Sequence, residues 1–338
     1  MKNWSEADFS NVSFGRNVKI MAEEIEIGPN VSIGDNVSIT SRRVQIGHNA
    51  RIEKGTEIRG LAQTMDLLSI GDQALIGFDN QIFCPSFLIG DYSQLHNTGL
   101  NTGYQPLTIG HNCWIGQNTI LNCTEVLSIG NNVRIGTQSQ LWTHVASGEL
   151  LEGCTLFNSR PLVLEDDVWV VGGAVISPGL TVRKRSIIMT GSVLTKSTEP
   201  GHTYAGIPAK DVTDKLSFWN DVSVDDKMEM MNEFIRQFLD LHPEYKSRIL
   251  SAPTDAQFTS QQDESIAIFA SFDWDTREIP AQISVFDLNS KTYSKKRSGI
   301  EIDFLKFNVG YRARFLPNCN PKNPSAAGAA NHEAKENG

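Results

Sequence analysis

Branched apolar residues recur every six positions along much of this chain. The spacing holds without a slip from Leu164 to Leu194, and glycine often follows the apolar residue, as in Ile109-Gly110. Other members of the series are Ile27, Ile33, Ile39, Ile46, Ile52, Ile58, Ile70, Ile76, Ile89, Leu95, Ile115, Ile129 and Ile135. Neither a helix nor a simple strand alternation has this period. It is typical of a parallel β-helix, in which three short strands and three tight corners make one coil.

The period predicts a β-helix domain over residues 1–210. Coil starts in its middle are 19 or 20 residues apart, so some corners carry an extra residue or two, and we place such an insertion near His96–Gly103. The six-residue period stops after Leu141, and a loop of about twenty residues precedes Leu164. Long excursions from a compact scaffold are usually functional, so this loop is a candidate site.

Residues 211–316 have no hexad period and predict a C-terminal α+β appendage. Ser223 is the predicted N-cap of a helix, and apolar residues at helical spacing continue along one face of it to Phe238. Pro243 is expected to end this helix. A linker is expected at about 252–263, followed by strands, a helix and a final strand. Residues 317–338 are rich in polar and small residues and are expected to be a disordered tail.

The composition and charge of the chain argue against several classes of partner and cofactor. The net charge is −9 with no early basic block, which argues against a nucleic-acid partner. Five cysteines without a CxxC pair argue against a disulfide framework and structural zinc. The first residues lack the features of a signal peptide, and no apolar run is long enough for membrane insertion. A cytoplasmic location is the expectation.

Two stretches carry a resemblance to a known family. EDDVWVVGGAVISPGLTV at 165–182 and MTGSVLTKSTEPGHTYAGIPAK at 189–210 resemble the hexapeptide-repeat acyltransferases, including bacterial nucleotide-sugar N-acetyltransferases. The resemblance implies a mainly β fold, a left-handed parallel β-helix followed by the appendage. It also implies a homotrimer with acetyl-CoA, the acetyl donor, in the cleft between two prisms.

His144 is the candidate catalytic residue. The family's general base is a histidine after a threonine, on a loop before the glycine-rich segment, and Thr143-His144 stands in that place. Acyl transfer from a thioester needs a base of near-neutral pKa, which histidine supplies. A polar loop residue without a catalytic role is the alternative.

The resemblance also implies cofactor-binding residues. They are Trp169, Gly172, Gly173, Ala174, Arg183, Arg185, Ala205, Gly206 and Lys210. In the family, the small residues let the pantetheine arm of CoA approach the backbone closely. The alternative is structural, because a tight solenoid corner needs glycine even without a ligand. The cations of the Arg183–Arg185 corner are predicted to hold CoA phosphates, with a solvated charge run as the alternative.

Trp142, Asn158 and His96 are candidate substrate-binding residues, with structural roles as the alternative for Trp142 and His96. His48 and His111 are most simply corner residues. A related solenoid family binds zinc through histidines, two of them five residues apart, and no pair here has that spacing, so no metal is expected.

The leading hypothesis is an acetyl-CoA-dependent N-acetyltransferase that acts on an amino group of a nucleotide-linked amino sugar in surface polysaccharide biosynthesis. Sugar or antibiotic O-acetylation is the alternative within enzymes. A non-catalytic trimeric solenoid module is the alternative outside them.

Overall fold

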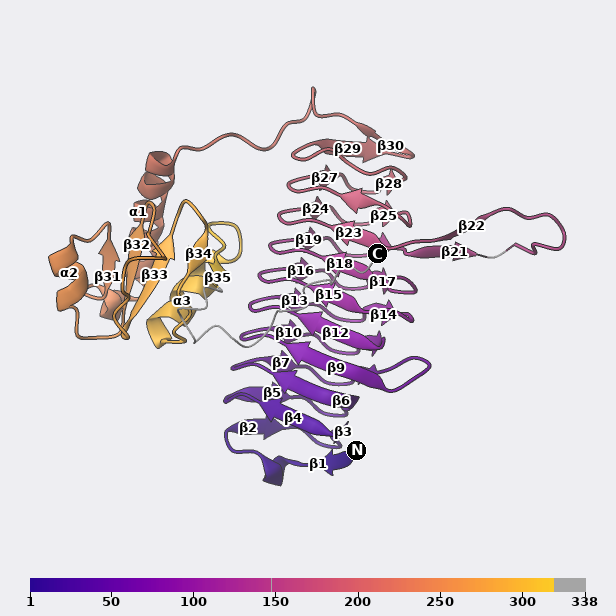
Figure 1. The fold of residues 1–338 in the computed structure, drawn as a ribbon, viewed down its shortest axis with the longest axis horizontal. Helices are drawn as coiled ribbons and strands as arrows, with labels where there is room; N and C mark the ends of the chain where they lie inside the picture. The colour runs from indigo at the N-terminus through magenta and orange to yellow at the C-terminus, as the bar shows by residue number, and fades with distance from the viewer. Residues whose placement is uncertain (147, 319–338) are drawn as a thin grey trace. The chain divides into compact units, whose positions relative to one another are not determined.

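The computed structural model describes residues 1–146 and 148–318, which divide into two compact units, the first ending at Trp219 and the second beginning at Asn220. The first unit is a parallel β-solenoid of many turns (Figure 1). Its strands form three faces, here named A, B and C, and the chain visits them in the order C, B, A in successive turns. The solenoid predicted from the hexad period is therefore confirmed.

Face A contains β3 (Lys19–Ala22), β8 (Glu57–Arg59), β11 (Gln81–Phe83), β14 (Leu100–Thr102), β17 (Ile120–Asn122), β20 (Gln140–Leu141), β25 (Val175–Ile176) and β28 (Val193–Leu194). Face C contains β4 (Glu24–Ile27), β9 (Met65–Ile70), β12 (Ser86–Ile89), β15 (Leu107–Ile109), β18 (Leu127–Ile129), β23 (Leu162–Leu164) and β26 (Thr181–Val182). The long strand β6 (Ser38–Ile46) continues from face A into face C.

Face B contains β2 (Val12–Phe14), β5 (Val31–Ile33), β7 (Arg51–Ile52), β10 (Leu75–Ile76), β13 (Gln94–Leu95), β16 (Trp114–Ile115), β19 (Arg134–Ile135), β24 (Trp169–Val170), β27 (Ile187–Ile188), β29 (Thr203–Gly206) and β30 (Ala209–Asp211). At the first coil, β1 (Lys2–Trp4) pairs antiparallel with β3, followed by a 3-10 turn at Glu6–Asp8. At the other end, β29 and β30 pair antiparallel.

The hexad residues make the core because equivalent positions stack from coil to coil. Ile115 lies beside Ile135, Ile135 beside Val170 and Val170 beside Ile188, and all four side chains are fully buried. Burying such a side chain contributes about 1.5–3 kcal/mol. The coils are so close that a Cβ at Gly90 would lie 2.7 Å from the carbonyl carbon of Gly110, which explains the glycine after many hexad positions.

The corners define three edges, and length variation is concentrated on one of them. Every corner on the B/A edge has four residues, as at 77–80 and 96–99. Corners on the A/C edge range from one residue at position 23 to twenty at 142–161, and β6 crosses this edge without a break. The insertion expected near His96 is therefore misplaced: His96 lies in a regular B/A corner, and the extra residues of this coil lengthen β14 and β15, on either side of the A/C edge.

The second unit is a five-stranded mixed sheet with helices. Its elements are α1 (Val224–Leu241), a 3-10 turn (Pro243–Tyr245), β31 (Ile249–Ser251), α2 (Asp255–Ser260), β32 (Ser265–Phe269), β33 (Ile283–Asp287), β34 (Thr292–Tyr293), α3 (Gly299–Asn308) and β35 (Leu316–Pro317). The sheet order is β31-β32-β33-β34-β35, and an aromatic group that includes Phe238, Phe286 and Phe304 is buried in this unit.

The helix from Ser223 ends before Pro243 as predicted, and the Ser223 hydroxyl accepts the Asp226 N–H. The expected linker at 252–263 is wrong, because Thr254 caps the short helix α2 there. Pro317 pairs with Tyr293 in the sheet, so the prediction of disorder is wrong at that residue. The remainder of that tail, from residue 319, lies outside the described residues.

Candidate active site

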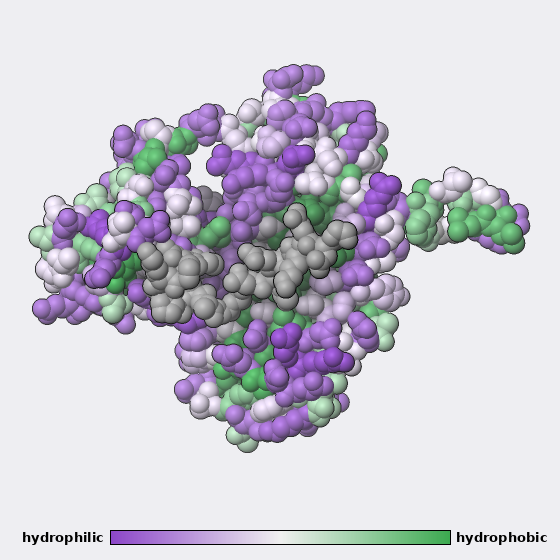
Figure 2. Space-filling view, in the orientation of Figure 1, coloured by the Kyte–Doolittle hydropathy of each residue, from purple (hydrophilic) through white to green (hydrophobic). Residues whose placement is uncertain are grey.

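The twenty-residue excursion on the A/C edge is a β-hairpin. Strands β21 (His144–Ala146) and β22 (Phe157–Ser159) pair antiparallel, with His144 opposite Ser159 (Figure 1). The hairpin projects from the solenoid, and Figure 2 shows apolar residues along it. Leu150, Leu151 and Phe157 are 72%, 89% and 64% exposed, so this chain leaves the apolar end of the hairpin uncovered.

His144 lies at the base of this hairpin, where its ring is held by the neighbouring coil. Its Nδ1 is 2.9 Å from Oδ1 of Asn122, the last residue of β17. Asn122 immediately precedes an A/C corner, as Leu141 does one coil later. The stacking of coils therefore brings together two side chains 22 positions apart.

The hydrogen bonds around Asn122 decide which ring nitrogen of His144 carries the proton. The backbone N–H of Thr143 can only donate, and it lies 3.2 Å from Asn122 Oδ1, so the amide presents its oxygen here. The amide Nδ2 accordingly donates to the Thr124 hydroxyl at 3.1 Å. His144 then donates from Nδ1 to Asn122, and Nε2 keeps a free lone pair. A neutral imidazole in this tautomer is ready to accept a proton at Nε2.

Other groups secure the base of the hairpin. The Ser159 hydroxyl donates to Glu125 Oε1 at 2.8 Å, and the Glu125 N–H donates to the Thr143 hydroxyl at 3.0 Å. The Trp142 ring stands edge-on to His144 with centroids 6.2 Å apart. Asn158 donates to the Pro178 carbonyl at 3.4 Å. The structure thus gathers three predicted site residues, His144, Trp142 and Asn158, at one place.

The predicted glycine-rich residues lie on another edge of the same chain. Gly172 and Gly173 form part of the B/A corner between β24 and β25, and Gly173 has a φ of +70°. Ala174, in the same corner, is fully buried, so its methyl group faces the core. Trp169 on face B is 48% exposed. His96 also lies on the B/A edge, packed against Trp114 with ring centroids 4.9 Å apart. None of these residues shares the A/C edge with His144.

The predicted phosphate-binding cations lie on the third edge. Arg183 and Arg185 belong to the C/B corner between β26 and β27. The Arg185 guanidinium lies over the Trp219 ring, 5.2 Å from its centroid, and the Arg185 carbonyl accepts the Trp219 indole N–H at 2.7 Å. Ala205, Gly206 and Lys210 lie in the β29–β30 cap. One chain therefore places the predicted base, glycine corner and cationic corner on three different edges.

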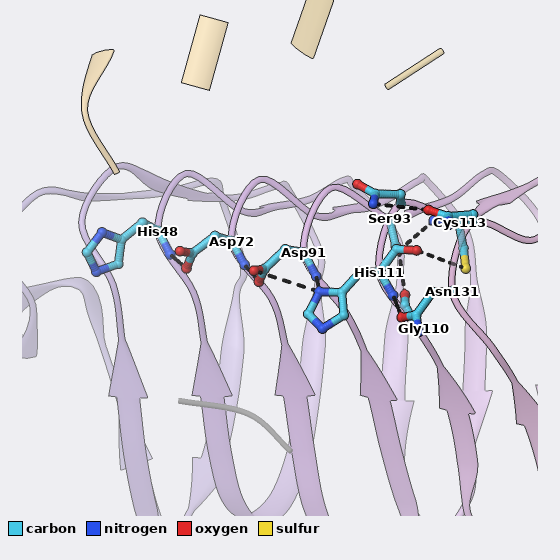
Figure 3. A network of polar contacts seen from close by, with 10 residues as sticks. His48, Asp72, Asp91, Ser93, Gly110, His111, Cys113 and Asn131 are labelled. Carbon is cyan, nitrogen blue, oxygen red and sulfur yellow. Dashed lines mark hydrogen bonds and ion pairs between the residues drawn. The ribbon is translucent and has the colours of Figure 1, made fainter. Parts of the chain in front are cut away.

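A ladder of polar side chains runs along the C/B edge (Figure 3). From Asp72 onward the corner side chain accepts the backbone N–H of the equivalent residue in the preceding coil, as when Asp91 accepts from Asp72 at 2.8 Å and Asn131 accepts from His111 at 2.9 Å. His111 Nδ1 accepts the Asp91 N–H at 2.9 Å, and His48 donates its own N–H to Asp72. The interpretation of His48 and His111 as corner residues is confirmed.

Sequence reasoning missed Asn122. The only available signal was its position, since a polar residue about one coil before His144 on the same strand face will stack under the histidine. Among residues 1–146 and 148–318, no group of three or more His, Cys, Asp or Glu side chains could hold a metal ion. No helix in the same residues is long and apolar enough to cross a membrane.

Comparison with known proteins supports the repeat. Residues 106–137 match the family model described as the hexapeptide repeat of succinyl-transferase. The chain is 29% identical over 124 residues to the galactoside O-acetyltransferase of Escherichia coli, covering 35% of this chain and 61% of that protein. It is 38% identical over 68 residues to the 2,3,4,5-tetrahydropyridine-2,6-dicarboxylate N-acetyltransferase of Staphylococcus aureus, covering 20% and 28%.

Among solved structures, the hexapeptide-repeat acetyltransferase VCA0836 of Vibrio cholerae, complexed with acetyl coenzyme A, matches with a TM-score of 0.32 and 23% identity. That match covers 46% of this chain and 72% of the other. The chain spans less than two thirds of the length of the curated relatives named above. The six-residue period, the parallel coils and the matched segment all indicate the same repeat. The chain is therefore a hexapeptide-repeat β-solenoid whose repeats resemble those of acetyltransferases.

Proposed function

We propose that this chain is an acetyl-CoA-dependent N-acetyltransferase acting on an amino group of a nucleotide-linked amino sugar. The observation that carries the proposal is the His144–Asn122 contact, since it leaves His144 Nε2 as a free base at the most elaborated edge of the solenoid. A solenoid used only as a scaffold needs no such arrangement.

The residues present fit the chemistry of acyl transfer. Acetyl-CoA, when bound, supplies an activated acyl group as a thioester. His144 Nε2 accepts the proton that the acceptor amine loses as its nitrogen bonds to the acyl carbon, and it can then return that proton to the leaving sulfur. Asn122 holds the ring in the tautomer that makes Nε2 the acceptor.

We propose that the site is completed in a homotrimer. Within one chain, Gly172 and Gly173 lie on the B/A edge and His144 on the A/C edge. Packing the B/A edge of one copy beside the A/C edge of the next would bring them together, and it would cover the apolar hairpin. The expected native mass is three times 37.4 kDa by sedimentation. An active monomer would contradict this arrangement.

The acceptor assignment rests on the extent of surface around His144. The hairpin enlarges the A/C edge beyond what a small acceptor needs. A nucleotide-linked sugar can use such surface, because binding energy from its remote parts positions the reacting atom. One relative is named an N-acetyltransferase and another an O-acetyltransferase, so O-acetylation of a sugar is the second candidate.

The test compares nucleotide-linked and free amino sugars at fixed acetyl-CoA, following thiol release. We expect the nucleotide-linked sugar to be the far better substrate. Equal catalytic efficiency, or activity only on hydroxyl acceptors, would exclude the proposed acceptor. The His144→Ala variant is the matched control: it should still bind CoA while turnover falls by roughly 10²–10⁴-fold. Unchanged turnover would remove His144 from the mechanism.

A further inference from the structure

An arginine without an ion-pair partner lies at the base of the hairpin, beside the candidate base. Arg160 directly follows β22, and its backbone N–H donates to the carbonyl of Thr143 at 3.0 Å. Its side chain is exposed, and among residues 1–146 and 148–318 no carboxylate lies within ion-pair distance of it. In a chain of net charge −9, this positive charge is available to a ligand.

The stem of Arg160 is positioned by the next coil. A Cβ at Gly179 would lie 2.8 Å from Arg160 Cδ and 3.1 Å from Arg160 Cβ, so the arginine stem rests on a corner that only glycine leaves open. Gly179 has a φ of +81°, which also favours glycine. Packing of the stem restricts the side chain before any ligand binds, which lowers the entropic cost of using its guanidinium.

A second cation continues the same edge. Lys196 lies two residues after the end of β28, in the A/C corner next to that of Gly179, and it is exposed with no ion-pair partner in the part of the chain that the structure describes. The Ser197 hydroxyl accepts the Thr181 N–H at 3.0 Å and so ties this corner to the coil of Gly179. From His144 toward the cap, the A/C edge therefore presents Arg160 and then Lys196.

We propose that Arg160, assisted by Lys196, binds a phosphate group of the ligand whose reacting end lies at His144. This inference rests on the proposed function. A guanidinium suits phosphate because it donates two parallel hydrogen bonds to the anion. The cations predicted for this task, Arg183 and Arg185, lie on the C/B edge, and Arg185 is engaged with Trp219. Both CoA and a nucleotide-linked acceptor carry phosphates, so the chemistry is shared and the experiment must separate the sources.

The experiment measures equilibrium binding to the full chain by calorimetry. CoA is compared with pantetheine, which lacks its phosphates, and UDP is compared with uridine. The variants are Arg160→Gln, Arg160→Lys, and Arg51→Gln as a matched control, because Arg51 is an exposed arginine on β7 of face B. Loss of a charge-assisted contact should weaken binding of the phosphate-bearing ligand by about 10–100-fold in Arg160→Gln.

The variant Arg160→Lys should retain part of the affinity, and Arg51→Gln should match the unaltered protein. Salt should weaken CoA or UDP binding less in Arg160→Gln than in the unaltered protein, because one screened charge is gone. If Arg160→Gln weakens the binding of CoA alone, Arg160 contacts a phosphate of the acetyl donor. If it weakens the binding of UDP alone, Arg160 contacts a phosphate of the acceptor.

Unchanged affinity of Arg160→Gln for both CoA and UDP would overturn the inference, as would an equal loss for pantetheine or uridine. The outcome is separable from the proposed function. Phosphate binding that depends on Arg160 without acetyl transfer would refute the function alone, and turnover with unaltered binding would refute this inference alone. Failure of the unaltered protein to bind CoA and UDP would refute both.

Discussion

Replacing Asn122 is the sharpest test of how this site works. Its Oδ1 accepts three hydrogen bonds, from the Thr143 N–H at 3.2 Å, the Thr143 hydroxyl at 2.8 Å and His144 Nδ1 at 2.9 Å. In Asn122→Ala the fully buried Thr143 keeps its hydroxyl contact to the backbone of residue 122, but its N–H loses its acceptor. An unsatisfied buried donor costs about 1–3 kcal/mol in the free energy of unfolding.

The same variant should also slow the reaction. His144 loses the bond that selects its tautomer, a contact worth roughly 1 kcal/mol, or about fivefold to tenfold in the population of the reactive form. Loss of ring orientation adds to this, up to the general-base contribution of roughly 10²–10⁴-fold. We therefore expect kcat to fall by at least about tenfold while the Michaelis constant for acetyl-CoA changes little.

Two further variants separate positioning from structural damage. Asn122→Asp keeps an acceptor for His144, and its charge favours the imidazolium, so the acid limb of the pH–rate profile should move to higher pH. Asn131→Ala removes a comparable bond, to the His111 N–H on the C/B edge, and should lower stability without altering kcat. The reasoning fails if Asn122→Ala keeps normal kcat, or if Asn122→Asp and Asn131→Ala both reproduce its kinetic defect at every pH.

Three other outcomes follow from the structure. Ile115→Ala in the solenoid core should lower the free energy of unfolding by about 2–5 kcal/mol in denaturant titrations, whereas Leu100→Ala, at a side chain 41% exposed, should cost less than about 1 kcal/mol. Burial raises the pKa of the Cys113 thiol to about 12, so mass-spectrometric mapping after alkylation should find Cys154 labelled long before Cys113. Burial also raises the pKa of the Glu301 carboxyl, so its contribution to stability should decline as pH rises from 4.5 through the folded-state value, and Glu301→Gln should flatten that part of a melting-temperature profile. An unchanged slope would show that hydrogen bonds offset the burial of Glu301.

The hexad period alone was enough to predict the solenoid and its core. A branched residue every sixth position points inward only if each side of the prism is one hexad long, and Ile115, Ile135 and Val170 are indeed buried in register. The sequence also predicted that His144 lies at the start of a long loop, because the six-residue period stops after Leu141. The helix that begins at Val224 was likewise predicted from local sequence, namely its Ser223 cap and the helical spacing of its apolar residues.

Which residues share an edge was decided by the tertiary structure. A residue's edge depends on the summed lengths of all the strands and corners before it, and the extra residues expected near His96 lie instead in β14 and β15, on either side of the A/C edge. Contacts across coils, such as His144 with Asn122 and Arg160 with Gly179, join residues about twenty positions apart that no local pattern links. Local periodicity determines what is buried because it acts within one strand, whereas the site arises from stacking between coils, which only the complete winding of the chain establishes.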